Sequence, residues 1–331
     1  MRKANIYYYQ LPMDSGVVLR QNKLTQREGW IVELMENEQQ GLGEIAPLVG
    51  FSKETLDEAY AETVSRLQTW IEGGELECHS ELPSVAFGLS MAQFELQGLL
   101  GKEGMYQVAP LCSGDPDDLF PVLDKMEGEK IAKIKVGLYE PIRDGILVNL
   151  FLESIPDLQL RLDANRAWSL DKANQFAKYV SPAYRSRIRY IEEPCKTPHE
   201  SITFAIESGM AIAWDETLQE AVREPDFSFE LLTGAKSIVI KPSLIGHIDL
   251  CIDLVQKAQS LGLIAVISSS IESSVGLCQL ARFAKQYTPE SIPGLDTLQL
   301  FKSQLHTAWP GSTLPVAKLA DQALIWRQQS D

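Results

Sequence analysis

The pattern of hydrophobic and polar positions changes near residue 105. Before that point, two apolar stretches of strand length are joined by a polar segment, and two longer stretches have the apolar spacing of amphipathic helices. The stretches with strand character are residues 4–13 and 30–37, the segment between them is 15–29, and those with helical character are 54–74 and 84–101. This order predicts a compact α+β unit.

After residue 105, short apolar runs alternate regularly with helical patterns. Each run is of strand length, is rich in Ile, Val and Leu, and carries a polar residue near its end. The runs lie at residues 133–137, 158–163, 188–193, 211–216, 237–242 and 263–270. Strands that alternate with helices predict right-handed βαβ units and a parallel sheet.

The polar residues that end these runs recur at intervals of 23 to 29 residues, which is the length of one βα unit. They are Lys135, Asp163, Glu192, Asp215, Lys241 and Ser268. Each therefore occupies the carboxyl end of its strand, where a (β/α) barrel carries its active site. A dinucleotide-binding fold is disfavoured, because the glycine-rich segment at 41–47 lacks the third glycine of that motif.

Three of the strand ends are carboxylates, Asp163, Glu192 and Asp215. Brought together they would repel one another unless a divalent cation neutralised them, and oxygen ligands of this kind suit Mg²⁺ or Mn²⁺. Each could instead cap the helix that follows its strand. Recurrence at one-unit spacing favours the metal site. Because adjacent strand residues point to opposite faces, only one of Glu192 and Glu193 is expected to point into the barrel.

Three lysines also lie at strand ends. Lys133 and Lys135 are two residues apart and project to the same face, and Lys241 ends a strand several units further along. Lysines on opposite sides of a metal site suggest proton transfer at a substrate carbon. Desolvation and a neighbouring cation both lower the pKa of a lysine, which makes Lys135 a candidate base with Lys133 beside it. Structural salt bridges to the carboxylates are the alternative.

Further polar residues are candidates for contact with a substrate. Arg161 shares a face with Asp163 and could bind a substrate carboxylate, or form a structural ion pair. Asn165 could form a hydrogen bond to water or to a group in the metal shell, or it could start a turn. The serine-rich stretch at 268–276 lies between a predicted strand and a predicted helix. The N-terminus of a helix can bind anions, although serines also cap helices without a ligand. The remaining expected substrate contacts are Ser268, Ser269, Ser270 and Gly294.

Composition narrows the class of protein. The 331 residues are 45% hydrophobic, and the formal net charge of −15 argues against nucleic acid or an anionic membrane as partner. Five scattered cysteines favour free thiols of a reducing compartment, and the four histidines match no metal or triad spacing. No apolar run approaches 18 residues and the N-terminus lacks a signal-like apolar stretch, so we expect a soluble cytoplasmic protein.

Taken in order, the motifs resemble those of the enolase superfamily, and in detail those of its o-succinylbenzoate synthase family in the proteobacterial form. They are KxK at 133–135, RxDxNxxW at 161–168, IEEPCK at 191–196, AWDE at 213–216, VIKPSLIG at 239–246 and SSSIESSVGL at 268–277. The similarity extends over nearly the whole chain. One KxK would be weak support, whereas this ordered set is specific.

The resemblance implies an α/β fold, a modified (β/α)₇β barrel of TIM type at residues 105–300. An α+β capping domain at residues 1–104, completed by residues 300–331, would cover it. Within the cap, residues 15–29 match a mobile loop that closes over substrate.

The resemblance also assigns roles to single residues. The Mg²⁺ ligands would be Asp163, Glu192 and Asp215; the catalytic acid/base would be Lys135, with Lys241 opposite it. From the residues alone, we expect Lys133 to tune the charge of Lys135 and Asn165 to lie in the shell around these groups.

The implied reaction is the syn dehydration of 2-succinyl-6-hydroxy-2,4-cyclohexadiene-1-carboxylate to 2-succinylbenzoate in menaquinone biosynthesis, through abstraction of the α-proton and a metal-stabilised enediolate. The expected partner is this small carboxylate, and the expected state is a monomer or weak homo-oligomer. Three alternatives stay open. They are another reaction of the superfamily (N-acylamino acid racemisation, dipeptide epimerisation or muconate cycloisomerisation), a class I aldolase, and a barrel that only binds a ligand.

Overall fold

The protein is described here by a computed structural model that covers residues 1–19, 22–112 and 115–330. Its chain forms two compact units. The first consists of Met1–Gln107, Ile240–Gln256 and Ile267–Asp331, and the second of Val108–Val239 and Lys257–Val266. Much of the C-terminal half of the expected barrel segment therefore groups with the N-terminal residues.

The first unit contains a four-stranded sheet in the order β13-β1-β2-β3, in which neighbouring strands run antiparallel. The strands are β1 (Arg2–Leu19), β2 (Asn22–Glu36), β3 (Gln39–Ile45) and β13 (Ala323–Gln329). Two short parallel strands, β11 (Gln304–Leu305) and β12 (Val316–Ala317), form a separate pair.

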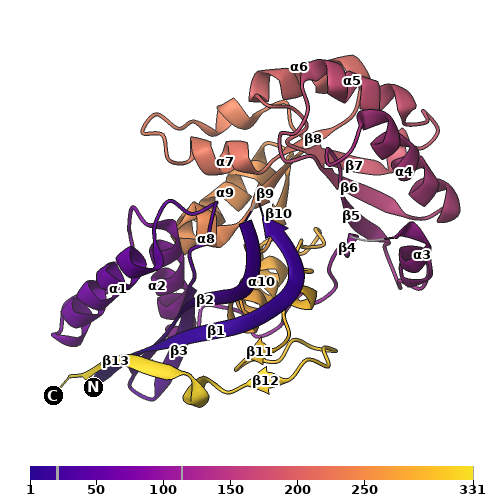
Figure 1. Ribbon diagram of the computed structural model, residues 1–331. Helices are drawn as coiled ribbons and strands as arrows, with labels where there is room; N and C mark the ends of the chain where they lie inside the picture. Colours follow the sequence, from indigo (N-terminus) through magenta and orange to yellow (C-terminus); the bar gives the residue numbers. More distant parts are fainter. Residues whose placement is uncertain (20–21, 113–114, 331) are drawn as a thin grey trace. The chain divides into compact units, whose positions relative to one another are not determined.

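The hairpin of β1 and β2 extends further than the hydrophobic pattern predicts (Figure 1). Residues 17–19 pair with residues 22–24 beyond a break in register that follows Pro12. The Asp-Ser-Gly sequence at 14–16 is typical of a turn, but pairing across the hairpin continues past it. Residues 20–21 of the expected mobile loop lie outside the described residues.

Helices cover this sheet because their contact faces are apolar or very small. The helices of this unit are α1 (Leu56–Ile71), α2 (Pro83–Leu96), α8 (Pro242–Ile245) and α10 (Ser274–Tyr287), with 3₁₀ turns η3 (Leu298–Leu300) and η4 (Leu319–Asp321). Thr55 and Glu58 form a reciprocal capping box at the start of α1. Gly43 of β3 lies against Gly88 of α2, where an added Cβ would stand 1.9 Å from the Gly88 carbonyl oxygen.

The second unit is built on a seven-stranded sheet in the order β10-β9-β8-β7-β6-β5-β4. Neighbouring strands from β4 to β9 pair in parallel. Its strands are β4 (Leu111–Cys112), β5 (Ile131–Lys135), β6 (Gln159–Asp163), β7 (Ile188–Glu192), β8 (Ile212–Trp214), β9 (Ser237–Ile240) and β10 (Ile264–Ile267). A strand overlaps each of the six predicted apolar runs, and the strands follow one another in the sheet in sequence order, which confirms the expected βαβ series.

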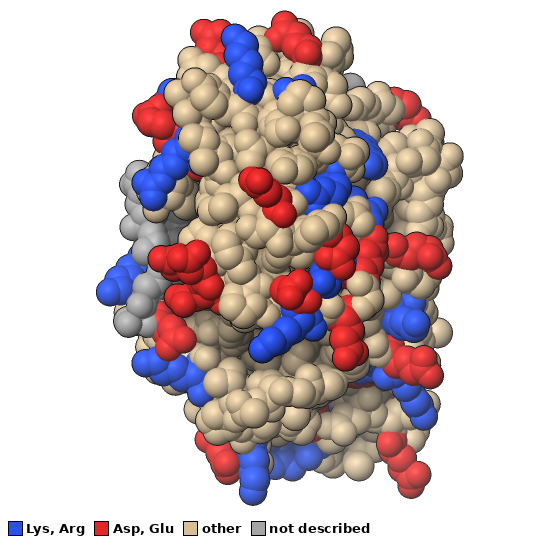
Figure 2. Space-filling view, turned by 90° about the vertical axis from the view of Figure 1, so that its right-hand side faces the viewer, with Lys and Arg blue, Asp and Glu red and all other residues tan. Residues whose placement is uncertain are grey.

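The helices between these strands lie along one side of the sheet, as α4 to α6 do in Figure 1. They are α3 (Pro116–Asp124), α4 (Pro141–Ser154), α5 (Leu170–Tyr179), α6 (Pro198–Ser208) and α7 (Glu216–Ala221), with 3₁₀ turns η1 (Arg185–Arg187) and η2 (Phe229–Leu232). The helix α9 (Ile248–Ser260) follows β9, and its residues up to Gln256 group with the first unit. Among the described residues, none of the helices has both the length and the apolar character needed to cross a membrane. Acidic and basic side chains are interspersed on the face drawn in Figure 2.

Candidate active site

Three neighbouring parallel strands place the predicted site residues at matching heights. Lys135 on β5 lies opposite Asp163 on β6, and Asp163 lies opposite Glu192 on β7. Two residues earlier, Lys133 lies opposite Arg161. Because βα units of similar length end their strands at the same edge of the sheet, residues far apart in sequence meet here.

Lys133 is the more enclosed lysine of the pair, with 17% of its side chain exposed against 39% for Lys135. Its Nζ donates to Glu192 Oε2 at 2.6 Å and lies 2.9 Å from Asp163 Oδ2. Burial alone would lower its pKa, but the charges of Asp163, Glu192 and Asp215 outweigh burial and hold the pKa of Lys133 well above its ordinary value. Lys133 is therefore a fixed cation that holds two carboxylates together.

Lys135 is held on one side and open on the other. Its Nζ donates to Asp163 Oδ2 at 2.7 Å and to Asn165 Oδ1 at 2.5 Å, while its side chain stays 39% exposed. Asn165, in a left-handed backbone conformation, also donates from Nδ2 to Glu216 Oε1 at 3.1 Å. The amine of Lys135 is thus oriented yet accessible.

The three predicted metal ligands are all buried, with at most 2% of each residue exposed. Burial raises the pKa of Glu192; Lys133 opposes this shift, whereas Asp163 and Asp215 add to it. Within the described ranges, no group of three or more His, Cys, Asp or Glu side chains is arranged to hold a metal ion. The lysine ammonium groups contact the carboxylates instead. Three buried carboxylates are nevertheless the donors that a hard divalent cation takes, so the residue set fits such an ion.

Glu193 holds the backbone of the third carboxylate. Its φ of 42° takes the chain out of the strand, and its Oε1 accepts from the backbone N–H of Asp215 at 3.0 Å and of Thr217 at 2.8 Å. Arg166 donates to Glu193 Oε2 at 3.1 Å. The hydrophobic pattern assigns Glu193 no role, and the doubled glutamate at 192–193 is the signal that could suggest one.

Arg161 lies beneath this cluster in the sheet. It is 5% exposed, its guanidinium stands 5.6 Å from the ring centre of Tyr190, and its Nε has no hydrogen-bond partner among the described residues. A buried cation with an unused donor could bind an anionic group, which is one of the two roles that the sequence leaves open for Arg161.

The serine loop, residues 268–273 between β10 and α10, brings together the predicted substrate contacts of the first unit. Ser268 Oγ donates to the Gly294 carbonyl oxygen at 3.1 Å, and the Ser269 N–H donates to the same oxygen at 3.1 Å. A Cβ on Gly294 would stand 2.9 Å from Ser268 Oγ, so glycine permits this approach. Ser270 is 2% exposed, and its Oγ lacks a hydrogen-bond partner in the described part of the chain.

Lys241 follows β9 directly and belongs to the same unit as the serine loop. Its carbonyl oxygen accepts from Leu244 and Ile245, and Pro242 begins α8 immediately after it. The end of the strand and the start of the helix thus fix the backbone of this lysine.

Comparison with protein families matches two descriptions to the chain. Residues 1–96 match "MenC, N-terminal domain", and residues 123–293 match "Enolase C-terminal domain-like". The o-succinylbenzoate synthase of Vibrio cholerae (strain M66-2) is 61% identical over 330 residues, which is 100% of this chain and 99% of that protein. That of Aliivibrio fischeri (strain MJ11) is 57% identical over 326 residues, 98% and 99% of the two chains.

Solved structures share the fold. The o-succinylbenzoate synthase of Thermosynechococcus elongatus, complexed with Mg in its active site, superposes with a TM-score of 0.71 at 22% identity, over 91% of this chain and 95% of that one. The L-Ala-D/L-Glu epimerase of Bacillus subtilis gives 0.74 at 19% identity, over 91% of each chain. These likenesses confirm the predicted fold class. The chain belongs to the o-succinylbenzoate synthase family of the enolase superfamily.

Proposed function

We propose that the protein catalyses the syn dehydration of 2-succinyl-6-hydroxy-2,4-cyclohexadiene-1-carboxylate to 2-succinylbenzoate, a step of menaquinone biosynthesis. The observation that carries the proposal is the difference between its two lysines. Lys133 is enclosed by carboxylates, whereas Lys135 is oriented by Asp163 and Asn165 and remains 39% exposed. A group that exchanges a proton with substrate must be both positioned and reachable. The 61% identity to the Vibrio cholerae enzyme supports this substrate.

Asp163, Glu192 and Asp215 would hold Mg²⁺, or Mn²⁺ in its place. When bound, the ion supplies positive charge to the substrate carboxylate beside the reacting carbon. Glu193 keeps the third of these residues in place through its backbone N–H.

Lys135 removes the proton α to the carboxylate. The electron pair of the C–H bond forms a ring double bond as the C–O bond to the hydroxyl on the same face breaks. Because the elimination is syn, Lys135 can return its proton to the departing oxygen, so that water leaves. Lys241 would stabilise the negative charge that develops on the substrate. The product is aromatic, which makes the step strongly downhill.

Substrate binding falls to the remaining predicted residues. We assign Arg161 and the serine loop to the carboxylate and oxo groups of the substrate, with Gly294 shaping the loop. Residues 15–29 of the capping domain, residues 1–104 with 300–331, would close over the barrel at 105–300. A closed loop excludes water and strengthens the electrostatic contacts inside.

We place the enzyme in the cytoplasm. We expect it to be a monomer or a weak homo-oligomer. All five cysteines are free and buried, as in proteins of reducing compartments.

An assay of the purified protein tests the function. With Mg²⁺ and the cyclohexadiene substrate, we expect 2-succinylbenzoate to form. Chromatography with mass spectrometry detects this product. Chelation of the metal by EDTA should stop its formation. The runner-up is another reaction of the superfamily. Racemisation of an N-acylamino acid without any formation of 2-succinylbenzoate would overturn the proposal in favour of that reaction.

A further inference from the structure

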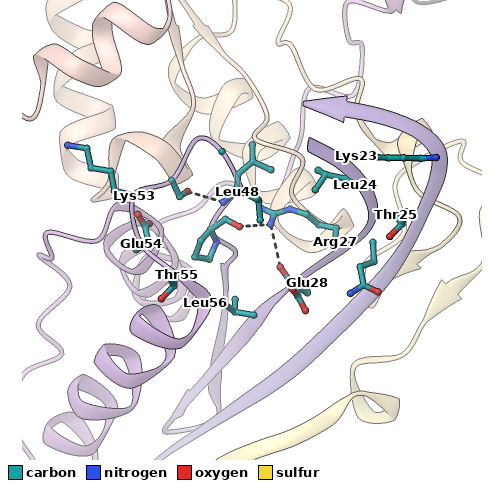
Figure 3. A pocket seen from close by; sticks show the side chains of 15 residues that line it. Lys23, Leu24, Thr25, Arg27, Glu28, Leu48, Lys53, Glu54, Thr55 and Leu56 are labelled. Carbon is teal, nitrogen blue, oxygen red and sulfur yellow. Dashed lines mark hydrogen bonds between the residues drawn. The ribbon is translucent and has the colours of Figure 1, made fainter. Parts of the chain in front are cut away.

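Arg27 of β2 is a buried cation whose role the proposed chemistry does not explain. It is 4% exposed and forms part of the wall of a pocket of about 470 Å³ lined by residues 23–28, 47–50 and 52–56 (Figure 3). Enclosing a guanidinium is costly unless its donors are satisfied. The positions of its hydrogen-bond partners therefore show what it stabilises.

The donors of Arg27 join three separate stretches of the first unit. Nε donates to the Ile271 carbonyl oxygen at 2.9 Å, Nη1 to that of Pro47 at 2.7 Å, and Nη2 to that of Ala46 at 2.5 Å. Nη1 also reaches the carbonyl oxygen of Glu28 at 3.4 Å. The acceptors are backbone atoms, so Arg27 fixes the path of the chain rather than one side chain.

The residue that Nε contacts has a strained backbone. Ile271, in the serine loop, has a φ of 61°. The left-handed region is unfavourable for a β-branched residue and persists only where the surroundings impose it. On its other side, the Ile271 N–H donates to Ser269 Oγ at 2.9 Å. Ile271 is thus held from both sides, by Arg27 at its carbonyl and by Ser269 at its amide.

Other buried charges hold the rest of the loop. Glu44 accepts from the Ser273 N–H at 2.8 Å and from its Oγ at 2.7 Å, and Glu272 accepts from the Ser270 N–H at 2.7 Å. Glu44 contacts the helical end of the loop, and Arg27 contacts its middle. Of these groups, Arg27 alone reaches the loop from β2.

We propose that Arg27 is a positioning residue that holds the serine loop in its strained conformation and thereby orients Ser269 and Ser270 toward substrate. The substrate part of this inference rests on the proposed function. The structural part, a tie between β2 and the loop at Ile271, stands on the contacts alone.

The shape of the guanidinium is essential to this role. Its fork presents Nε toward Ile271 while Nη1 and Nη2 face Ala46 and Pro47. A lysine keeps the charge but offers its donors from a single atom. Arg27→Lys therefore removes the tie while leaving a cation in place. Lys53→Ala is the matched control, because Lys53 is exposed, lines the same pocket and extends away from Arg27 in Figure 3.

Hydrogen–deuterium exchange of the full-length protein without substrate measures the tie directly. We expect peptides spanning 268–273 to exchange about tenfold faster or more in Arg27→Lys, because the local opening free energy falls, and to stay unchanged in Lys53→Ala. In the turnover assay, KM should rise about fivefold or more in Arg27→Lys with kcat within about threefold, the pattern of lost substrate binding.

A second variant keeps the test decisive if Arg27→Lys folds poorly. Ile271→Gly relieves the strain and loosens the same loop, so it should also accelerate exchange, and adding Arg27→Lys to it should have little further effect. The proposal would be overturned if the loop peptides of Arg27→Lys exchanged at the wild-type rate. It would also be overturned if the double variant exchanged faster by the product of the two single accelerations. A wild-type protein without turnover would instead count against the proposed function, since the exchange result does not depend on it.

Discussion

Replacing Lys133 by methionine removes an ammonium that is largely enclosed by carboxylates, with 17% of the side chain exposed, and keeps an unbranched side chain of similar length. The two carboxylates that it joins, Glu192 at 2.6 Å and Asp163 at 2.9 Å, are each 2% exposed and would be left beside each other without this cation. Removing one partner of a buried ion pair costs about 3–5 kcal/mol. The same change at Lys135, whose side chain is 39% exposed, should cost less than about 1 kcal/mol.

Urea unfolding followed by circular dichroism in the presence of EDTA measures both values, because the chelator removes stabilisation by bound cations. We expect the midpoint of Lys133→Met to fall clearly below that of wild type, with Lys135→Met close to wild type. Equal losses for the two variants, or a Lys133→Met protein as stable as wild type, would refute the assignment of Lys133 as the cation that stabilises this cluster.

Three further changes have definite expected outcomes. Glu193→Gln should weaken Mn²⁺ binding about tenfold in a calorimetric titration, because its carboxylate holds the backbone of Asp215. Gly43→Ala should lower the free energy of unfolding by about 3 kcal/mol or more, because its Cβ would overlap the Gly88 carbonyl oxygen. Burial lowers the pKa of His247, so the unfolded chain takes up this proton more readily, and stability measured by urea unfolding should decline as the pH falls below about 6.5.

Each of these predictions has a control. Glu220→Gln removes an exposed charge that also contacts Arg166 and should leave Mn²⁺ affinity unchanged. Gly101→Ala meets only the flexible Gln286 side chain and should fold normally. His247→Gln should flatten the pH dependence even though Asp249 and Glu77 act against the lowered pKa. Matching results for a variant and its control, or an unaltered pH profile in His247→Gln, would contradict the reasoning.

The sequence predicts the meeting of Lys135, Asp163 and Glu192 because two regularities suffice for it. βα units of similar length end their strands at one edge, and residues in register on parallel strands lie side by side. The roles of these residues as base and metal ligands remain predictions. Lys133 and Lys135 contact Asp163 or Glu192 because neighbouring parallel strands are in register. These contacts therefore follow from the spacing of the strand ends along the sequence.

Features that depend on irregular backbone or distant contacts could not be predicted in this way. Strand alternation sends Glu193 away from Glu192, but a left-handed turn brings its carboxylate to the Asp215 backbone. Arg27 and Ile271 are 244 positions apart, and no periodic pattern connects them. The length of the β1–β2 hairpin was also missed, because pairing across it overrides the local turn propensity of residues 14–16.

Comparison of turnover and metal binding in Lys135→Ala tests the central claim most directly. With Mg²⁺ and the cyclohexadiene substrate, formation of 2-succinylbenzoate should fall by about a thousandfold or more, because the variant lacks the amine proposed to transfer the proton. Its Mn²⁺ affinity, measured by calorimetry, should stay within about threefold of wild type, because Lys135 is not among the proposed metal ligands. Turnover close to that of wild type would contradict the account.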